Sequence, residues 1–232
     1  MKLTVINPNS TVSMTDKILA SARAVAAAGV EVTGRTAHGA PASIEGHADE
    51  VMCAAHLLRE VREAQAEGAD AIVVACFDDP AIGACREVAT GPVIGICEAG
   101  IKAASMIATS FSIVTTLPRS VPVIEELVRR YGLDHQCRRV RSAEIPVLAL
   151  EEPGSNARLL IRAEILRAIE EDRCEAVVLG CAGMSDLTEW LSHETGIPVI
   201  DGVTVATKFA EALVGAGLKT SKIGAYAPPI QK

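Results

Sequence analysis

The chain has 232 residues, of which 49% are hydrophobic and 22% charged, a balance that is typical of a folded globular protein and excludes a disordered chain. The net charge is −7, with only one Trp, two Tyr and three Phe; a nucleic-acid partner, which would need basic patches or stacking aromatic side chains, is therefore not expected. The longest stretch without a charged residue, Ala103–Pro118, is too short and too polar to span a bilayer. The start of the chain lacks the apolar core of a signal peptide. We therefore expect a cytoplasmic protein that does not act at a membrane.

Short β-branched runs alternate with longer amphipathic patterns, which predicts parallel strands connected by helices in an α/β fold. In the first half, the expected elements are strand Leu3–Ile6, a helix over about residues 11–28, strand Val30–Thr36, helix Asp49–Glu67, strand Ala71–Ala75, a helix and the short strand Val93–Ile96. In the second half, they are strand Phe111–Thr115, helix Pro118–Tyr131, strand Val147–Leu150, a helix over about residues 156–172, strand Ala176–Gly180, a helix through Trp190 and strand Pro198–Ile200.

The second half of the chain repeats the first. The run Ala-Ile-Val-Val-Ala-Cys ending at Cys76 aligns with Ala-Val-Val-Leu-Gly-Cys ending at Cys181, and Thr-Gly-Pro-Val-Ile-Gly further on aligns with Thr-Gly-Ile-Pro-Val-Ile-Asp-Gly. This indicates a tandem duplication of one α/β unit. We expect two similar Rossmann-like lobes, each with a parallel four-stranded sheet, related by a pseudo-twofold axis and enclosing the active site in the cleft between them. The first lobe would cover residues 1–97, with the C-terminal helix and tail, residues 202–232, packing back on it. The second lobe would cover residues 98–201.

Cys76 and Cys181 occupy matching positions in the repeat. Each stands where a buried strand ends and a helix is expected to begin, at the sheet edge where ligands bind and where a helix dipole would lower a thiol pKa. Two such groups facing one cleft suit racemisation, because a thiolate can remove a proton from one face of a carbon while a thiol returns one to the other. Backbone N–H groups at the helix starts would hold the enolate oxygen. The alternative, that both are buried structural cysteines, is weakened by their matched positions.

The other five cysteines have no matched partner in the repeat and are interpreted as small buried side chains. A total of seven cysteines, with no Cys-x-x-Cys pair, argues against both a disulfide framework and a zinc site. No metal is therefore expected.

Several short motifs together resemble a known family. They are Ile-Asn-Pro-Asn-Ser-Thr near the N-terminus, Pro-Ala-Ser-Ile-Glu-Gly-His-Ala-Asp-Glu, Ala-Cys-Phe-Asp-Asp-Pro, Thr-Thr-Leu-Pro-Arg-Ser, Gly-Cys-Ala-Gly-Met and Pro-Val-Ile-Asp-Gly. In this order and spacing, over nearly the whole chain, they resemble the hydantoin racemases of the aspartate/glutamate racemase superfamily. The resemblance implies an isomerase that racemises 5-monosubstituted hydantoins without a cofactor, with Cys76 and Cys181 as the two acid/base residues.

The residues beside the cysteines separate this chain from amino-acid racemases, in which Asn-Thr and Thr-His are expected to follow the two cysteines. Here Phe77 and Asp78 follow Cys76, Ala182 and Gly183 follow Cys181, and no Arg stands beside either to hold a carboxylate. A neutral ring is therefore the favoured substrate. Allantoin, a hydantoin with a 5-ureido group, is an alternative substrate, and a maleate isomerase-like member, in which one cysteine is a nucleophile, is an alternative enzyme. Arylmalonate decarboxylases keep only one of the two cysteines. A non-enzymatic small-molecule binding protein and a thiol redox protein are the alternatives from other classes.

The remaining candidates for substrate contacts lie at strand ends, in one loop and beside the cysteines. They are Pro8, Asn9, Ser43, Ile44, Phe77, Asp78, Thr115, Thr116, Gly180, Ala182 and Gly183. Phe77 would form an apolar wall and the two threonines would hydrogen-bond the ring. Structural roles are alternatives: capping for Asn9, the core for Phe77, and the first turn of a helix for Asp78 and Asp79, which we favour. Glu45 and His47 are interpreted as loop or capping residues. The expected partner is a small-molecule substrate, and assembly into a homo-oligomer is compatible with the composition.

Overall fold

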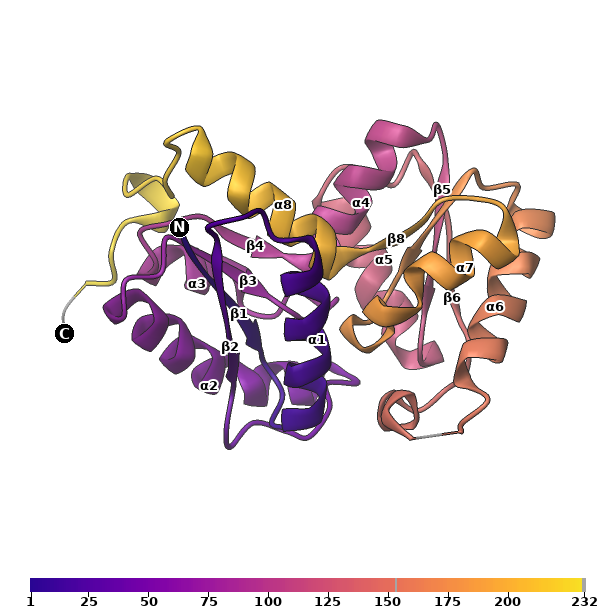
Figure 1. Cartoon of the computed structure of the whole chain (residues 1–232), viewed down its shortest axis with the longest axis horizontal. Coiled ribbons are helices and arrows are strands. Elements are labelled where there is room, and N and C mark those ends of the chain that lie inside the picture. The colour runs from indigo at the N-terminus through magenta and orange to yellow at the C-terminus, as the bar shows by residue number, and fades with distance from the viewer. Residues whose placement is uncertain (153, 231–232) are drawn as a thin grey trace.

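In the computed structural model, which describes residues 1–152 and 154–230, the chain forms two lobes side by side (Figure 1). Each lobe contains a parallel four-stranded sheet, and the two strand orders, β2-β1-β3-β4 and β6-β5-β7-β8, are equivalent. The strands are β1 (Lys2–Asn7), β2 (Glu31–Thr36), β3 (Ala71–Val74), β4 (Val93–Gly95), β5 (Phe111–Thr115), β6 (Cys137–Ser142), β7 (Ala176–Leu179) and β8 (Val199–Asp201). The fold class expected from the repeat is thus confirmed.

Helices connect the strands and cover both faces of each sheet. They are α1 (Val12–Val25), α2 (His47–Ala66), α3 (Ile82–Val88), α4 (Ile96–Ile107), α5 (Val121–Arg130), α6 (Ala157–Arg167), α7 (Thr188–Thr195) and α8 (Gly202–Gly215). Because both faces are covered, every residue of β3 and β7 is buried. Among the described helices, none is both long enough and apolar enough to cross a membrane.

The expected strand Val147–Leu150 is wrong, because these residues form a 3-10 turn, Val147–Glu151. The edge strand of the second sheet is instead β6, whose sequence Cys-Arg-Arg-Val-Arg-Ser has no apolar run. An edge strand is paired on one side only, so it can carry polar residues. Because of these arginines, the hydrophobic pattern did not predict this strand.

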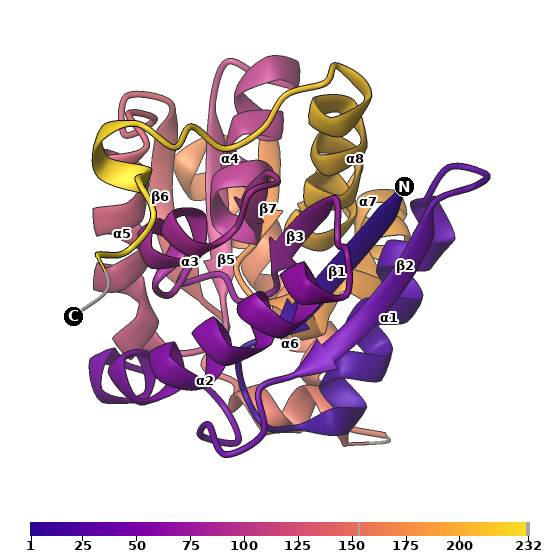
Figure 2. The same cartoon turned by 90° about the vertical axis from the view of Figure 1, so that its left-hand side faces the viewer.

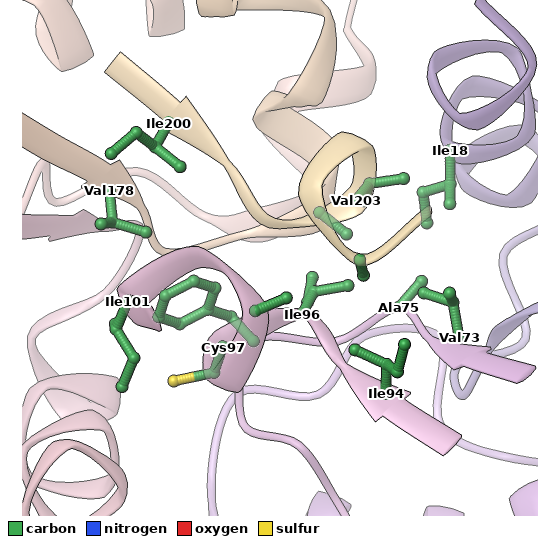
Figure 3. Close-up of a cluster of buried hydrophobic side chains, with 14 of the residues drawn as sticks. Ile18, Val73, Ala75, Ile94, Ile96, Cys97, Ile101, Val178, Ile200 and Val203 are labelled. Carbon is green, nitrogen blue, oxygen red and sulfur yellow. The ribbon is translucent and has the colours of Figure 1, made fainter. Parts of the chain in front are cut away.

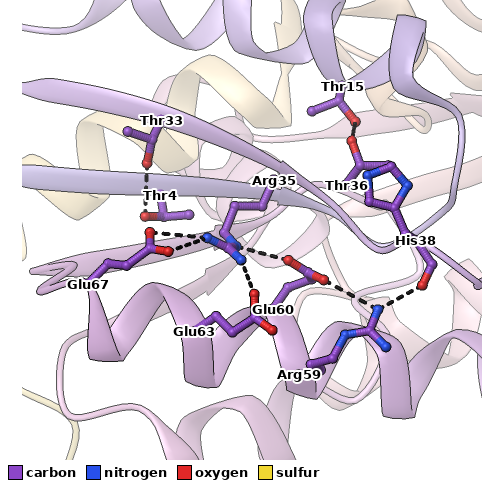
Figure 4. Close-up of polar contacts among 10 residues, drawn as sticks. All are labelled: Thr4, Thr15, Thr33, Arg35, Thr36, His38, Arg59, Glu60, Glu63 and Glu67. Atoms are coloured by element: carbon purple, nitrogen blue, oxygen red, sulfur yellow. Dashed lines mark hydrogen bonds and ion pairs between the residues drawn. The ribbon is translucent and has the colours of Figure 1, made fainter.

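One of those arginines, Arg141, has a counterpart in the first lobe. Arg35 lies opposite Ile6 in the β1–β2 pair, and Arg141 lies opposite Val114 in the β5–β6 pair, at the same register. Arg35 pairs with three carboxylates of α2, on Glu60, Glu63 and Glu67 (Figure 4). Arg141 pairs with Glu164, Glu171 and Asp172, on α6 and the turn that follows it. Each edge strand is thus fastened to the helical segment that covers it.

The helices that follow the last strand of each lobe cross over to the other lobe. Helix α4 leaves β4 but packs on β7 and β8, whereas α8 leaves β8 and packs on β3 and β4 (Figure 1). Where the two helices meet, a Cβ added to Gly202 would lie 2.3 Å from the carbonyl oxygen of Ile96, so only glycine allows this approach. Side chains from both halves, among them Ile101, Val178 and Val203, form one continuous core (Figure 3). The two lobes therefore share a core, which holds their sheets in a defined relation.

The segment after α8 runs across the first lobe toward α3 (Figure 2). The backbone N–H of Thr220 donates to the carbonyl oxygen of Thr90 at 3.1 Å, and the Lys222 ammonium donates to the carbonyl oxygen of Arg86 at 2.7 Å. These bonds hold the tail against α3 and the loop before β4.

Candidate active site

Cys76 and Cys181 line one small cavity between the lobes. Each lies two residues after the end of a buried strand, and each begins the same turn: the backbone N–H of Asp79 donates to the Cys76 carbonyl, and that of Met184 to the Cys181 carbonyl, both at 3.1 Å. The repeat therefore places two thiols in equivalent local structures, on opposite lobes, against a common space.

Most residues predicted to contact substrate lie on this cavity. The described lining consists of Asn9, Met14, Ile44, Ala75, Cys76, Phe77, Asp78, Thr115, Thr116, Ser120, Val147, Gly180, Cys181 and Ala182. Three candidates do not line it: Pro8 is buried, the Ser43 hydroxyl bonds the Glu45 carboxylate at 2.9 Å, and the Gly183 carbonyl accepts from Lys17.

Sequence reasoning missed four lining residues: Met14, Ala75, Ser120 and Val147. The helical period of the first helix indicated that Met14 is buried, but not that it faces the cavity. Val147 was assigned to a strand that does not form. Ser120 belongs to the Thr-Thr-Leu-Pro-Arg-Ser motif, which was the one available signal.

Two polar lining residues use their hydrogen bonds to shape the strand ends. The Asn9 side-chain oxygen accepts from the backbone N–H of Thr11 at 2.9 Å and from the Asn7 amide at 2.8 Å. The Thr115 hydroxyl donates to the Gly180 carbonyl at 2.9 Å, and a Cβ on Gly180 would lie 2.7 Å from that of Thr115. Gly180 therefore allows β5 and β7 to converge beside Cys181.

The expectation that helix dipoles lower both thiol pKa values is wrong. Cys76 is not at a helix start, since α3 begins at Ile82, whereas Cys181 is the N-cap residue of a 3-10 helix, Ala182–Leu187. Burial raises the pKa of Cys76 well above its usual value, with Asp78 adding to the effect. Burial also raises the pKa of Cys181, to about 11. The enclosure that creates the site also desolvates the thiolates.

Backbone donors oppose these shifts symmetrically. The N–H two residues after each cysteine, on Asp78 and on Gly183, hydrogen-bonds the sulfur and favours the thiolate form. The positive charge of Lys17 also lowers the pKa of Cys181. The site therefore holds two thiols at rest, each beside a group that stabilises its anion.

Asp79 fixes the loop that carries Cys76. Its carboxylate accepts from the backbone N–H groups of Cys97 and Glu98, at 3.1 and 2.9 Å, and from the Tyr131 hydroxyl at 2.8 Å. It therefore caps the start of α4, which corrects the interpretation of Asp78 and Asp79 as first-turn residues of the helix that follows them. Burial raises the pKa of Asp79 to about 7.

Asp78 has a different environment, because its side chain lines the cavity and is only 7% exposed. Burial, followed by the charge of Glu50, raises the pKa of Asp78 to about 7.

Lys17 ties the Cys181 turn to the first lobe. Its ammonium donates to the carbonyl oxygens of Leu150 and Gly183, at 3.1 and 3.4 Å, and forms an ion pair of 3.1 Å with Glu151. Lys17 lies on α1, so the Cys181 turn is held by the first helix of the other lobe.

Two other features of the molecule bear on where the chemistry lies. Within residues 1–152 and 154–230, no group of three or more His, Cys, Asp or Glu side chains could hold a metal ion. A larger hollow lies between α4, α8 and residues 218–226. None of the residues described around it is a cysteine, so the candidate chemistry lies in the cavity between the lobes.

Comparison with known proteins gives a consistent picture. Residues 3–210 match the family described as Asp/Glu/hydantoin racemase. The chain is 55% identical to a hydantoin racemase of Rhizobium meliloti, over 99% of this chain and 95% of that protein. It is 41% identical to a hydantoin racemase of Pseudomonas sp. (strain NS671), over 100% of this chain and 93% of that protein. The solved structure of an allantoin racemase from Klebsiella pneumoniae superposes with a TM-score of 0.98 at 45% identity, covering 100% of this chain and 95% of that one.

Proposed function

This chain belongs to the Asp/Glu/hydantoin racemase family and is a racemase, and from that premise we propose that it interconverts the enantiomers of 5-monosubstituted hydantoins without a cofactor. The observation that carries the proposal is that Cys76 and Cys181 line one cavity from opposite lobes. Racemisation needs a proton acceptor and a proton donor on opposite faces of one carbon, and two thiols so placed supply both.

In the proposed reaction, the thiolate of one cysteine takes the proton from C5 of the ring. The electron pair of the C5–H bond moves toward the adjacent C4 carbonyl, whose oxygen becomes the enolate oxygen. The thiol of the other cysteine then gives its proton to the opposite face of C5. The product is the other enantiomer, and the two sulfurs have exchanged protonation states, so the same site runs in either direction.

The raised thiol pKa values have a kinetic consequence. Since both cysteines are held as thiols, one proton must leave the site before turnover. The adjacent carbonyl acidifies C5–H, so a thiolate is a sufficient base once formed. We expect the rate to increase with pH over the range in which this thiolate forms.

The cavity lining supports a neutral substrate. Among its described residues there is no Lys or Arg to hold a carboxylate, and Met14, Ile44, Phe77 and Val147 provide apolar surface. A free amino acid would therefore bring an unpaired charge into the site. A hydantoin ring is uncharged, and its 5-substituent would pack against the apolar side chains.

Isotope exchange at C5 tests the proposal. Optical-rotation decay and deuterium uptake are measured on D- and L-5-benzylhydantoin, with wild type, Cys76→Ser and Cys181→Ser. We expect wild type to racemise both, and each variant to lose turnover while retaining exchange on opposite enantiomers, because one thiol remains for one face. Cys137→Ser, whose thiol lies outside the described cavity lining, is the matched control. Binding without exchange would instead indicate a binding protein, and turnover in both single variants would contradict the two-thiol mechanism.

A second substrate, allantoin, is favoured by the similarity to allantoin racemases of Klebsiella pneumoniae and Pseudomonas fluorescens, at 45% and 39% identity. Allantoin is a hydantoin with a polar 5-ureido group, so the same proton transfers apply. The apolar lining leads us to propose apolar 5-substituents as the preferred class. Comparing kcat/KM on 5-benzylhydantoin and on allantoin decides between them, and a higher value on allantoin would reverse the assignment.

We also propose that the enzyme acts in the cytoplasm as a homo-oligomer. All seven cysteines are unpaired, as is usual in a reducing compartment. At the end of α4, Met106 and Ile107 are 73% and 60% exposed, and neighbouring exposed apolar side chains are typical of contact surfaces. Light scattering during size-exclusion chromatography tests the assembly, and a monomer mass would contradict it.

A further inference from the structure

The two halves of the site differ at one chemically important position. Two residues after each cysteine, the first lobe has Asp78 and the second has Gly183. The backbone N–H of each bonds the neighbouring sulfur, so the backbone is equivalent while the side chain is not. Besides the two thiols, Asp78 contributes the one ionisable side chain in the described lining of the cavity.

The Asp78 side chain is nearly buried, at 7% exposed, and its carboxyl oxygens have no hydrogen-bond partner among the described residues. Buried carboxyl groups are normally hydrogen-bonded. Asp79, its neighbour, accepts three such bonds. A carboxyl group that lines a cavity and has no protein partner can form a hydrogen bond with a ligand in that cavity.

The groups that interact electrostatically with Asp78 are acids. They are Glu50 and Cys53 of α2, Cys97 of α4 and the two cavity thiols. Among the described residues, no cation lowers the pKa of Asp78. Burial and Glu50 raise the pKa of Asp78 to about 7, so its protonated form is available at neutral pH.

The charge state of Asp78 matters for the chemistry. An ionised Asp78 raises the pKa of both cavity thiols, and it would also repel the enolate that forms on proton removal. A protonated Asp78 has neither effect, and its O–H can donate to an oxygen that becomes negative, as donors in an oxyanion hole do.

We infer that Asp78 acts as a neutral acid that donates a hydrogen bond to the C4 carbonyl oxygen of the hydantoin ring, the oxygen on which enolate charge develops. This assignment rests on the proposed function. The proton stays on Asp78 throughout, while the C5 proton is exchanged with the two sulfurs. Asp78 thus selects a neutral cyclic amide whose carbonyl adjoins the reacting carbon, and it discriminates against a carboxylate.

The inference predicts a particular pH dependence. When the rate requires a thiolate together with protonated Asp78, kcat/KM rises with pH up to about 7 and then levels, because each gain in thiolate is offset by loss of protonated Asp78. Asp78→Asn keeps an N–H donor that does not titrate, so its kcat/KM should keep rising above pH 7. Asp78→Ala removes the donor, and kcat should fall about 100-fold, as for loss of an oxyanion-hole donor.

The experiment measures kcat and KM on 5-benzylhydantoin between pH 6 and 8.5 for wild type, Asp78→Asn, Asp78→Ala and Glu50→Gln, with the enzyme-free rate subtracted. Glu50 lies outside the described cavity lining, and Glu50→Gln removes the negative charge that raises the pKa of Asp78. It should therefore lower the pKa of Asp78 and start the plateau at a lower pH. If Asp78→Ala does not fold, Asp78→Asn and Glu50→Gln still test the inference.

The outcomes separate this inference from the proposed function. A plateau in wild type that is absent in Asp78→Asn supports it. A wild-type rate that climbs through pH 7–8.5 as steeply as that of Asp78→Asn, or an Asp78→Ala variant within about twofold of wild type, overturns it while leaving the two-thiol mechanism intact. A wild type that does not racemise hydantoins, with Cys76→Ser binding them unchanged, overturns both.

Discussion

The Tyr131 hydroxyl donates a 2.8 Å hydrogen bond to the Asp79 carboxylate, and so joins α5 of the second lobe to the loop that carries Cys76. Lys17 makes the reciprocal connection, from α1 of the first lobe to the turn that carries Cys181. Because the two thiols must face one carbon from opposite sides, their separation depends on the relation between the lobes. These two contacts, together with the packing of α4 and α8 on the opposite lobes, fix the position of one lobe relative to the other.

Gly95→Ala should disturb the Cys76 loop. A Cβ at this position would lie 2.2 Å from the Asp79 carboxyl carbon, so Asp79 must move away from the start of α4. We expect a loss of about 1–3 kcal/mol in the free energy of unfolding and a fall in kcat, measured by urea denaturation and by racemisation. Gly83→Ala, in α3, meets no atom within 4 Å and is the matched control, since alanine favours a helix. Equal behaviour of the two variants would contradict the role assigned to Asp79.

Lys17→Met should raise the pKa of Cys181, because it removes the positive charge that lowers this pKa. The alkylation rate of Cys181 by iodoacetamide, followed by peptide mass spectrometry across pH, measures the shift. We expect slower alkylation of Cys181 at each pH below its pKa, and an unchanged rate at Cys76. Lys208→Met is the control, since Lys208 pairs with Glu211 on the surface of α8. An unchanged alkylation profile for Cys181 would show that Lys17 does not act on this thiol.

Stability should fall as the pH rises toward neutrality. Asp78 and Asp79 both have folded pKa values of about 7, raised from 3.8. A carboxyl group with a raised pKa binds its proton more tightly in the folded state, so its contribution is complete below about pH 4 and is lost as the pH rises through about 7. In Asp78→Asn one of the two titrations is removed, so the urea midpoint should fall less between pH 5 and 8. A fall identical to that of wild type would contradict the raised pKa of Asp78.

Arg141→Met should destabilise the protein more than Arg35→Met. Arg141 and its partners Glu164 and Asp172 are each 6–7% exposed at the side chain. Glu164 also pairs with Arg167, so removal of Arg141 leaves mainly the buried Asp172 without a cation, at a cost of about 3–5 kcal/mol. Arg35 is 19% exposed, its partners Glu63 and Glu67 are 49% and 69% exposed, and its buried partner Glu60 also pairs with Arg59, so water and Arg59 can replace it. Chemical denaturation of both variants measures the difference. A larger loss for Arg35→Met would contradict this ranking.

The duplicated α/β architecture and the candidate pair Cys76 and Cys181 could be predicted from the sequence. Both follow from short local patterns: an unbroken apolar run predicts a strand covered on both faces, and the end of such a strand lies at the ligand edge of a parallel sheet. Neither inference required knowledge of what lies opposite in space.

The features that depend on distant partners could not be predicted, because the sequence does not show which residues meet in space. The arginine-rich strand β6 is stabilised by ion pairs between Arg141 and carboxylates of a later helical segment. Asp79 caps α4, which is not the helix that directly follows it in the sequence. The thiol pKa values are raised, whereas the sequence predicted that they are lowered. A helix dipole can be assigned from the local sequence, but desolvation depends on which residues from elsewhere in the chain bury the group. Cys76, Cys181 and Asp78 therefore have their chemical character set by residues from both lobes, which only folding brings together.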